Sequence, residues 1–188
     1  MPIIDPVQQQ YDKFQQYPTV PYNIIKYLIA NDDLIFKLLN YNDPAAWNDD
    51  SAHPKLNATE KANLVYNGLR EINHSRIFLN LGSDDSVLEE TSFLRIGMPD
   101  LIPTNTYRGN LTIGFEVLCH YKVSTLSCYI ARDDMILQRL IEVLNGADIP
   151  NVGRIFFDAK ISQKCRAYMI SQIPYRGKAL VMCANMLG

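Results

Sequence analysis

The amino-acid sequence predicts a single domain of the α+β class, in which a mostly antiparallel sheet packs on helices. The 188 residues are 47% hydrophobic and 20% charged, which is the composition of an ordinary globular domain. Segments with helical periodicity precede a cluster of β-type segments. The segment 111–123 alternates apolar and polar side chains, which is typical of a long strand with one buried face. The expected order is helices, three strands, one helix and two strands.

Two short amphipathic helices are expected near the N-terminus. Residues 1–20 are rich in Gln and Pro and are interpreted as an extended arm, so that the domain spans 21–188. Pro21 suits the first turn of a helix to about Ala30, with an apolar stripe at Ile25, Leu28 and Ile29. Asn31–Asp33 interrupt this helix and are suited to cap a second one, whose stripe is Ile35, Leu38 and Leu39.

The middle of the chain is expected to hold one more helix and two strands. Asn57 and Glu60 have the spacing of a capping box at the start of a short helix. The β-type segment 76–80 follows, and a second strand is expected at 93–98, before a proline-bearing connection at 99–106. An acidic loop separates the two strands and carries Asp84, Asp85, Glu89 and Glu90.

The strand at 111–123 has the clearest pattern in the chain. Its odd positions are Leu111, Ile113, Phe115, Val117, Cys119, Tyr121 and Val123. The next predicted element is a helix that opens at Arg132–Asp134 and ends near Gly146. We expect the odd face of the strand to pack against the stripe of this helix, which is Ile136, Leu137, Leu140, Ile141 and Leu144. Two further strands are expected at 155–157 and 179–184.

The residue types that carry chemistry do not form a recognisable motif. Cys119 and His120 are neighbours on a strand, so their side chains point to opposite faces, and we expect Cys119 to belong to the core. His53 and His74 are far from His120 in sequence and lack metal-binding spacing. The spacing of the four cysteines is irregular, as in a reduced protein, and the glycines form no phosphate-binding loop. The residues therefore predict neither a catalytic site, nor a metal site, nor a bound cofactor.

The charge balance and the apolar runs argue against several classes of protein. A net charge of −2 disfavours a protein whose main task is to grip nucleic acid by its phosphates. No apolar run approaches the ~20 residues that a membrane-spanning helix needs. The N-terminus does not have the pattern of a signal peptide. We expect a protein that is made in a reducing cytoplasm and has no membrane partner.

Three stretches resemble the neck proteins of tailed bacteriophages: Tyr107–His120, Arg132–Leu137 and Leu144–Gly146. The chain is most similar to tail-terminator (tail-completion) proteins. The order of helices and strands is similar over about residues 22–186, and the local amino-acid sequence over about residues 107–158. The resemblance implies a structural virion protein without enzyme activity or cofactor, made in the host bacterial cytoplasm. It also implies a homo-oligomeric ring, hexameric or dodecameric, that contacts other neck, tail-tube or portal-connector proteins. Genomic DNA would pass through the channel without sequence-specific contacts.

The candidate contacts between subunits are charged. Glu116, His120 and Lys122 share the polar face of the long strand, and Asp84 and Asp85 belong to the acidic loop. A head-to-tail ring brings two different surfaces together, so either this loop meets the basic C-terminal third across the joint or one of the two lines the channel. Two alternatives stay open: a head-completion or stopper ring of the same neck, and a small cytoplasmic enzyme that uses Cys119.

Overall fold

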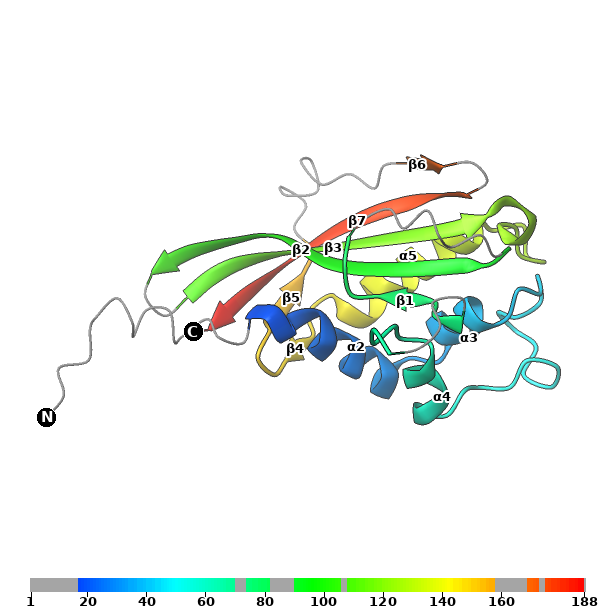
Figure 1. The fold of residues 1–188 in the computed structure, drawn as a ribbon, viewed down its shortest axis with the longest axis horizontal. Coiled ribbons are helices and arrows are strands. Elements are labelled where there is room, and N and C mark those ends of the chain that lie inside the picture. Colours follow the sequence, from blue (N-terminus) through cyan, green and yellow to red (C-terminus); the bar gives the residue numbers. More distant parts are fainter. Residues whose placement is uncertain are drawn as a thin grey trace, which may run out of the picture.

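The computed structural model describes residues 17–69, 74–81, 90–105, 108–157, 169–172 and 175–187. Helices cover one face of a curled sheet, so the predicted α+β class is confirmed (Figure 1). The described strands form one seven-stranded sheet, and their pairings are antiparallel except for that of the first two strands. Residues 1–16 of the expected arm, and Asp84 and Asp85 of the acidic loop, lie outside the described residues.

The helical layer begins before the expected domain boundary. Tyr17–Thr19 form a 3-10 turn (η1), and Val20 opens α2 with a fully buried side chain. These residues are helical instead of extended because Val20 continues the apolar face of α2 one turn before Ile24. The N-terminal helices are α2 (Val20–Asn31), α3 (Leu34–Asn40) and α4 (Ala58–Asn63).

Two predicted caps are confirmed, each with a precise donor and acceptor. The Asn57 side chain accepts from the backbone N–H groups of Thr59 and Glu60, and Glu60 accepts from the backbone N–H of Asn57. Asp32 accepts from the backbone N–H of Ile35 at 2.7 Å. Both caps satisfy amides that the first turn of a helix leaves unpaired.

The sheet has the order β1-β2-β3-β7-β5-β4, with β6 paired to β7. Its strands are β1 (Ile77–Phe78), β2 (Ser92–Asn105), β3 (Arg108–His120), β4 (Asp148–Ile149), β5 (Gly153–Phe156), β6 (Met169–Gln172) and β7 (Tyr175–Leu187). The helix α5 (Arg132–Leu144) lies between β3 and β4 in the chain. Sequence periodicity missed β4 and β6, which are only two and four residues long.

The expected connection at 99–106 is wrong, because β2 continues to Asn105. Its register against β3 shifts twice, between Gly97 and Asp100 and between Pro103 and Asn105. Bulges of this kind accommodate proline, which cannot donate to a ladder. The two prolines therefore interrupt the pairing locally without ending the strand.

The long strand β3 ends three residues earlier than its pattern predicts. His120 caps a 3-10 turn, η3 (Tyr121–Val123), and its Nδ1 accepts from the backbone N–H of Lys122 at 3.3 Å. This cap turns the chain away from the sheet. Tyr121 is therefore 60% exposed and does not pack against α5, contrary to the sequence expectation.

The rest of the predicted core is confirmed. Leu111, Ile113, Phe115, Val117 and Cys119 are fully buried in one cluster with the apolar stripe of α5, of which Ile141 is only partly buried. A smaller cluster on the opposite face of the sheet joins Phe78, Phe93 and Leu118, with Tyr66 and Tyr175 against it. The sheet is therefore apolar on both faces at the end where β1 pairs with β2.

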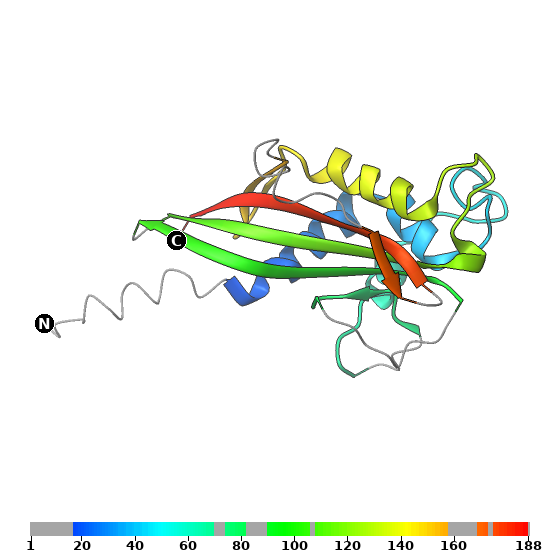
Figure 2. The same cartoon turned by 90° about the horizontal axis from the view of Figure 1, so that it is seen from above.

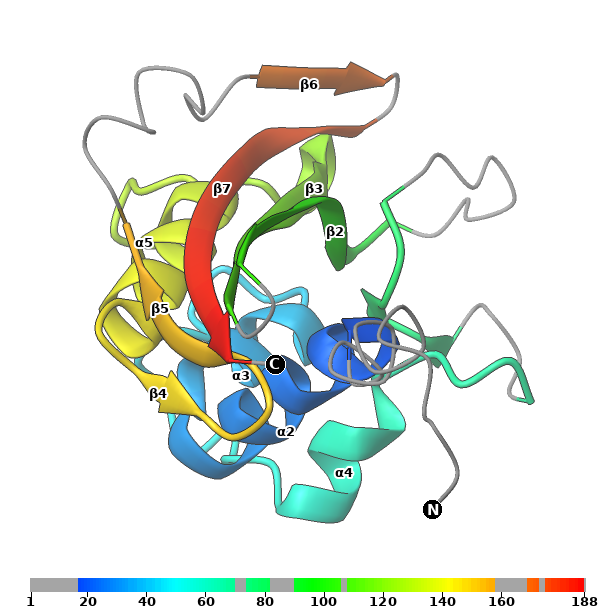
Figure 3. The same ribbon diagram turned by 90° about the vertical axis from the view of Figure 1, so that its left-hand side faces the viewer.

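The three long strands run past the helical layer at one end of the molecule. Figures 1 and 2 show β2, β3 and β7 extending beyond the helices, and Figure 3 shows how strongly β7 is curved. We call the strand ends on this side, residues 102–105, 108–110 and 185–187, the blade. The segment that follows β3 lies at the opposite end of the long axis (Figure 1).

Candidate functional site

Three of the predicted interface residues, Glu116, His120 and Lys122, are described, and they do not form one exposed patch. Glu116 is half-buried, with its Oε2 3.9 Å from a guanidinium nitrogen of Arg95. His120 is 4% exposed, and its ring packs edge-on against that of Tyr175, with 5.3 Å between the ring centroids. Lys122 lies past the end of the strand and donates to Glu90. The alternation of side chains along the strand therefore correctly places Glu116 and His120 on one face. The same alternation does not apply to Lys122, which lies beyond the strand.

Cys119 belongs to the core, as expected. Its side chain is fully buried in the main cluster, and its cross-strand partner is the buried Ser92. Cys183 is buried as well, whereas Cys128 is half-buried. A buried thiol reacts with a soluble reagent only when the surrounding structure opens.

Thiol labelling of the native protein should therefore separate the cysteines. We expect a maleimide at neutral pH to modify Cys128, and to reach Cys119 and Cys183 only after urea unfolds the protein. Peptide mapping by mass spectrometry assigns each modified residue, and Cys128→Ser is the control that removes the native signal at position 128. Selective labelling of Cys119 in the folded protein would contradict its place in the core and would support the alternative of an enzyme that uses this thiol.

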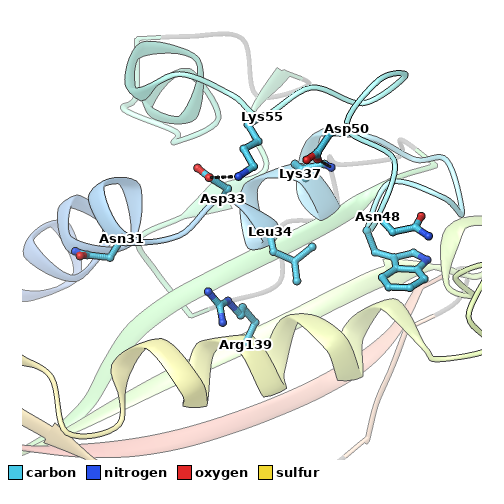
Figure 4. A pocket seen from close by; sticks show the side chains of 9 residues that line it. Asn31, Asp33, Leu34, Lys37, Asn48, Asp50, Lys55 and Arg139 are labelled. Carbon is cyan, nitrogen blue, oxygen red and sulfur yellow. Dashed lines mark hydrogen bonds and ion pairs between the residues drawn. The ribbon is translucent and has the colours of Figure 1, made fainter.

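A polar pocket of about 400 Å³ opens where α2, α3 and α5 meet (Figure 4). Its lining includes Asp33, Leu34, Lys37, Trp47, Asp50, Lys55 and Arg139. Figure 4 shows Lys55 reaching Asp33, Lys37 reaching Asp50, and Arg139 rising from α5 toward Leu34. Because this pocket contains several charged side chains, we considered whether they could form a binding or catalytic site.

The carboxylates in and beside the pocket are held by cations. Asp33 accepts from Lys61 at 2.7 Å and lies 3.5 Å from Lys55, and the hydrogen bond from Lys61 lowers the pKa of Asp33. The nearly buried Lys37 donates to Asp50 at 2.6 Å, which lowers the pKa of Asp50. These pairs fix α3 to the loop after it and to α4. They are contacts of the folded scaffold.

Asp32 joins α5 to this network. Its side chain is fully buried and accepts from Nε of Arg139 at 2.5 Å, in addition to capping α3. Lys61 donates to the carbonyl oxygens of Ile29, in the last turn of α2, and of Asp32, which follows that turn. A cation on the carbonyls at a helix C-terminus is stabilising. The junction between α2 and α3 is therefore tied to both α4 and α5.

Arg132 is the most important polar residue that sequence reasoning missed. Its guanidinium is fully buried and donates to five backbone carbonyl oxygens, at 2.7–3.0 Å, of Leu38, Tyr41, Asn42, Asp43 and Val123. Burial lowers the pKa of this group. The one signal in the sequence is that an arginine in the first turn of a helix opposes the helix dipole. Its place is explained by the end of α3, whose free carbonyls it satisfies.

Asp133 is buried beside Arg132, and burial raises the pKa of its carboxyl. The folded state therefore keeps a proton that the unfolded state, with a pKa of about 3.9, has already released. Stability falls as the pH rises through the interval between these two pKa values. The charged carboxylate therefore destabilises the fold at neutral pH.

We expect Asp133→Asn to raise the urea midpoint at pH 7, because the amide cannot lose a proton. The gain should disappear below about pH 4, where the carboxyl of Asp133 is protonated in both the folded and the unfolded state. The matched control is Asp134→Asn, since Asp134 is exposed and bonded to Lys178 and should give no gain. A loss of stability in Asp133→Asn at pH 7 would contradict the assignment.

The described residues give no metal cluster and no membrane span. No group of three or more His, Cys, Asp and Glu side chains among them could hold a metal ion. Within the same part of the chain, no helix is long and apolar enough to cross a membrane.

Comparison with known proteins yields one match. A family model described as YomW covers residues 32–182, which include every helix from α3 onward and most of the sheet. No curated protein and no solved structure matches the chain. The family name is associated with a Bacillus prophage. The chain therefore belongs to the YomW family and is a phage-related protein.

Proposed function

We propose that this chain is a structural virion protein that forms a ring at the head–tail junction of a tailed phage, as a tail terminator does. Membership of a phage-associated family supports this proposal. Within the neck, such a ring would contact other neck proteins and the tail tube or portal connector. Genomic DNA would pass through its channel.

The observation that carries the proposal is the two-ended shape of the subunit. The blade projects at one end of the long axis, and the segment after β3 lies at the other (Figures 1 and 2). Both ends expose large apolar side chains, Ile102 at the blade and Tyr121, Tyr129 and Ile130 opposite. A ring of identical subunits is built from two different surfaces on each subunit. Exposed apolar side chains at both ends suit such contacts.

The charges suit passage of DNA. With a net charge of −2, the chain offers few uncompensated cations to hold phosphates. The lysines in and beside the polar pocket are already committed to Asp33 and Asp50. We therefore expect the ring to guide the duplex without binding it tightly.

Removal of the gene from the phage tests this function. We expect the mutant to produce heads and tails that fail to join, and a plasmid copy of the wild-type gene to restore complete particles. A tail terminator leaves DNA-filled heads beside free tails, whereas loss of a stopper ring would let the heads lose their DNA. Complete infectious particles without the gene would contradict both neck roles.

A further inference from the structure

Tyr129 adopts a backbone conformation that a tyrosine rarely adopts. Its φ is +64°, in the left-handed region where the Cβ of an L residue is crowded. Its side chain is 94% exposed, so packing within the subunit does not compensate for this strain. Backbone strain of this kind persists only where the surrounding structure imposes it.

The loop around Tyr129 is held firmly. The backbone N–H of Tyr129 donates to the carbonyl of Leu126, and the N–H of Leu126 donates to the carbonyl of Ile130, at 2.9 and 3.0 Å. Ser127 is fixed from outside the loop, because Trp47 Nε1 donates to its Oγ at 2.9 Å. The loop therefore presents its tip in one conformation.

The segment after β3 exposes three large side chains, which we call the knob: Tyr121, Tyr129 and Ile130, which are 60%, 94% and 43% exposed. Tyrosines with an apolar ring and a hydroxyl are typical anchors of protein interfaces. A rigid backbone lowers the entropy lost on binding. The knob thus has the chemistry and the preorganisation of an interface anchor.

A second set of exposed side chains begins at the blade, at the other end of the long axis (Figures 1 and 2), and continues to Arg154 on the neighbouring strand β5. The register pairs Ile102 with Asn110, Asn110 with Asn185, and Asn185 with Arg154, across β2, β3, β7 and β5. Residues paired in this way share one face of a sheet. We call these four exposed residues the acceptor row.

We propose that the knob of one subunit docks on the acceptor row of a second copy of this chain. Ile102 offers an apolar contact for the rings, the amides of Asn110 and Asn185 can hydrogen-bond the phenol hydroxyls, and Arg154 can stack on a ring face. The two surfaces are different and lie at opposite ends, as a head-to-tail contact requires. This inference rests on the proposed ring and names its joint.

Photo-crosslinking tests the contact in phage-producing cells. We place a benzophenone amino acid at position 129, and the control places it at position 69, where Leu69 is 92% exposed on a loop. The expected product from position 129 is a covalent dimer of this chain, with the link mapped to the peptide that contains Ile102 or Asn110. Crosslinks to a different protein, to another part of the chain, or no crosslink would overturn the inference.

Tyr129→Asn separates an interface role from a structural one. Asparagine tolerates the left-handed region, so the urea midpoint of the purified variant should not fall. Loss of the aromatic anchor should lower the yield of complete particles by at least about tenfold in the complementation assay, whereas Leu69→Asn should restore full yield. Normal yield with Tyr129→Asn, in phage that depends on the gene, would refute the knob and leave the neck function standing. Phage that does not depend on the gene would refute the neck function instead.

Discussion

Replacement of Arg132 by methionine should cost about 3–5 kcal/mol of folding free energy, or prevent folding at 37 °C. The carbonyl oxygens of Leu38 and Val123 would stay buried without this donor, at about 1–3 kcal/mol each, and those of Tyr41, Asn42 and Asp43 would lose a partly buried hydrogen bond. A domain has only about 5–15 kcal/mol of net stability. Arg132→Met should therefore be among the most damaging single substitutions in the chain.

Urea unfolding followed by the fluorescence of Trp47, the only tryptophan, measures this effect. Arg154→Met is the matched control, because Arg154 is exposed and its loss should change stability by no more than about 0.5 kcal/mol. Arg132→Lys should fall between the two, since lysine keeps the charge but has only three donors. Equal midpoints for Arg132→Met and Arg154→Met would contradict the buried network.

Phe115→Ala should destabilise the protein by about 3–5 kcal/mol, as a large truncation in a core does. Phe115 is fully buried at the centre of β3, where it faces the helical layer and pairs with Ile96 and Leu180. The remaining structure can collapse only partly onto the cavity, so the lost contacts are not replaced.

Tyr121→Ala is the informative control for this substitution. The sequence pattern puts Tyr121 on the same buried face as Phe115, whereas the fold leaves it 60% exposed after the cap at His120. Its loss should therefore change the unfolding midpoint little. If Tyr121→Ala were as damaging as Phe115→Ala, the 3-10 turn would be misplaced; a wild-type midpoint for Phe115→Ala would show that the strand face is wrong.

Local patterns predict those parts of the fold that local interactions decide. The alternation in β3, the stripe of α5 and the capping box at Asn57 each need only neighbours in the sequence, and each is confirmed. The second half of β2 escapes prediction because its prolines suggest a connection. Two register shifts against β3 accommodate them instead, and only the tertiary pairing reveals these shifts.

The candidate site is less predictable because its partners come from distant parts of the chain. Strand parity correctly puts Glu116 and His120 on one face, but Tyr175, which covers His120, comes from β7. Four of the five carbonyls that bind Arg132 lie about ninety residues earlier in the chain, and they belong to backbone, which has no sequence signature. The acceptor row likewise exists only once four strands are aligned.

Electron cryomicroscopy of the intact particle tests the proposed ring most directly. The expected image is a closed ring of copies of this chain between the head connector and the tail tube. The fold should fit this ring with the knob of each subunit on the acceptor row of the next. A neck whose density cannot accommodate the chain, in particles whose purified proteins do not include it, would contradict the account.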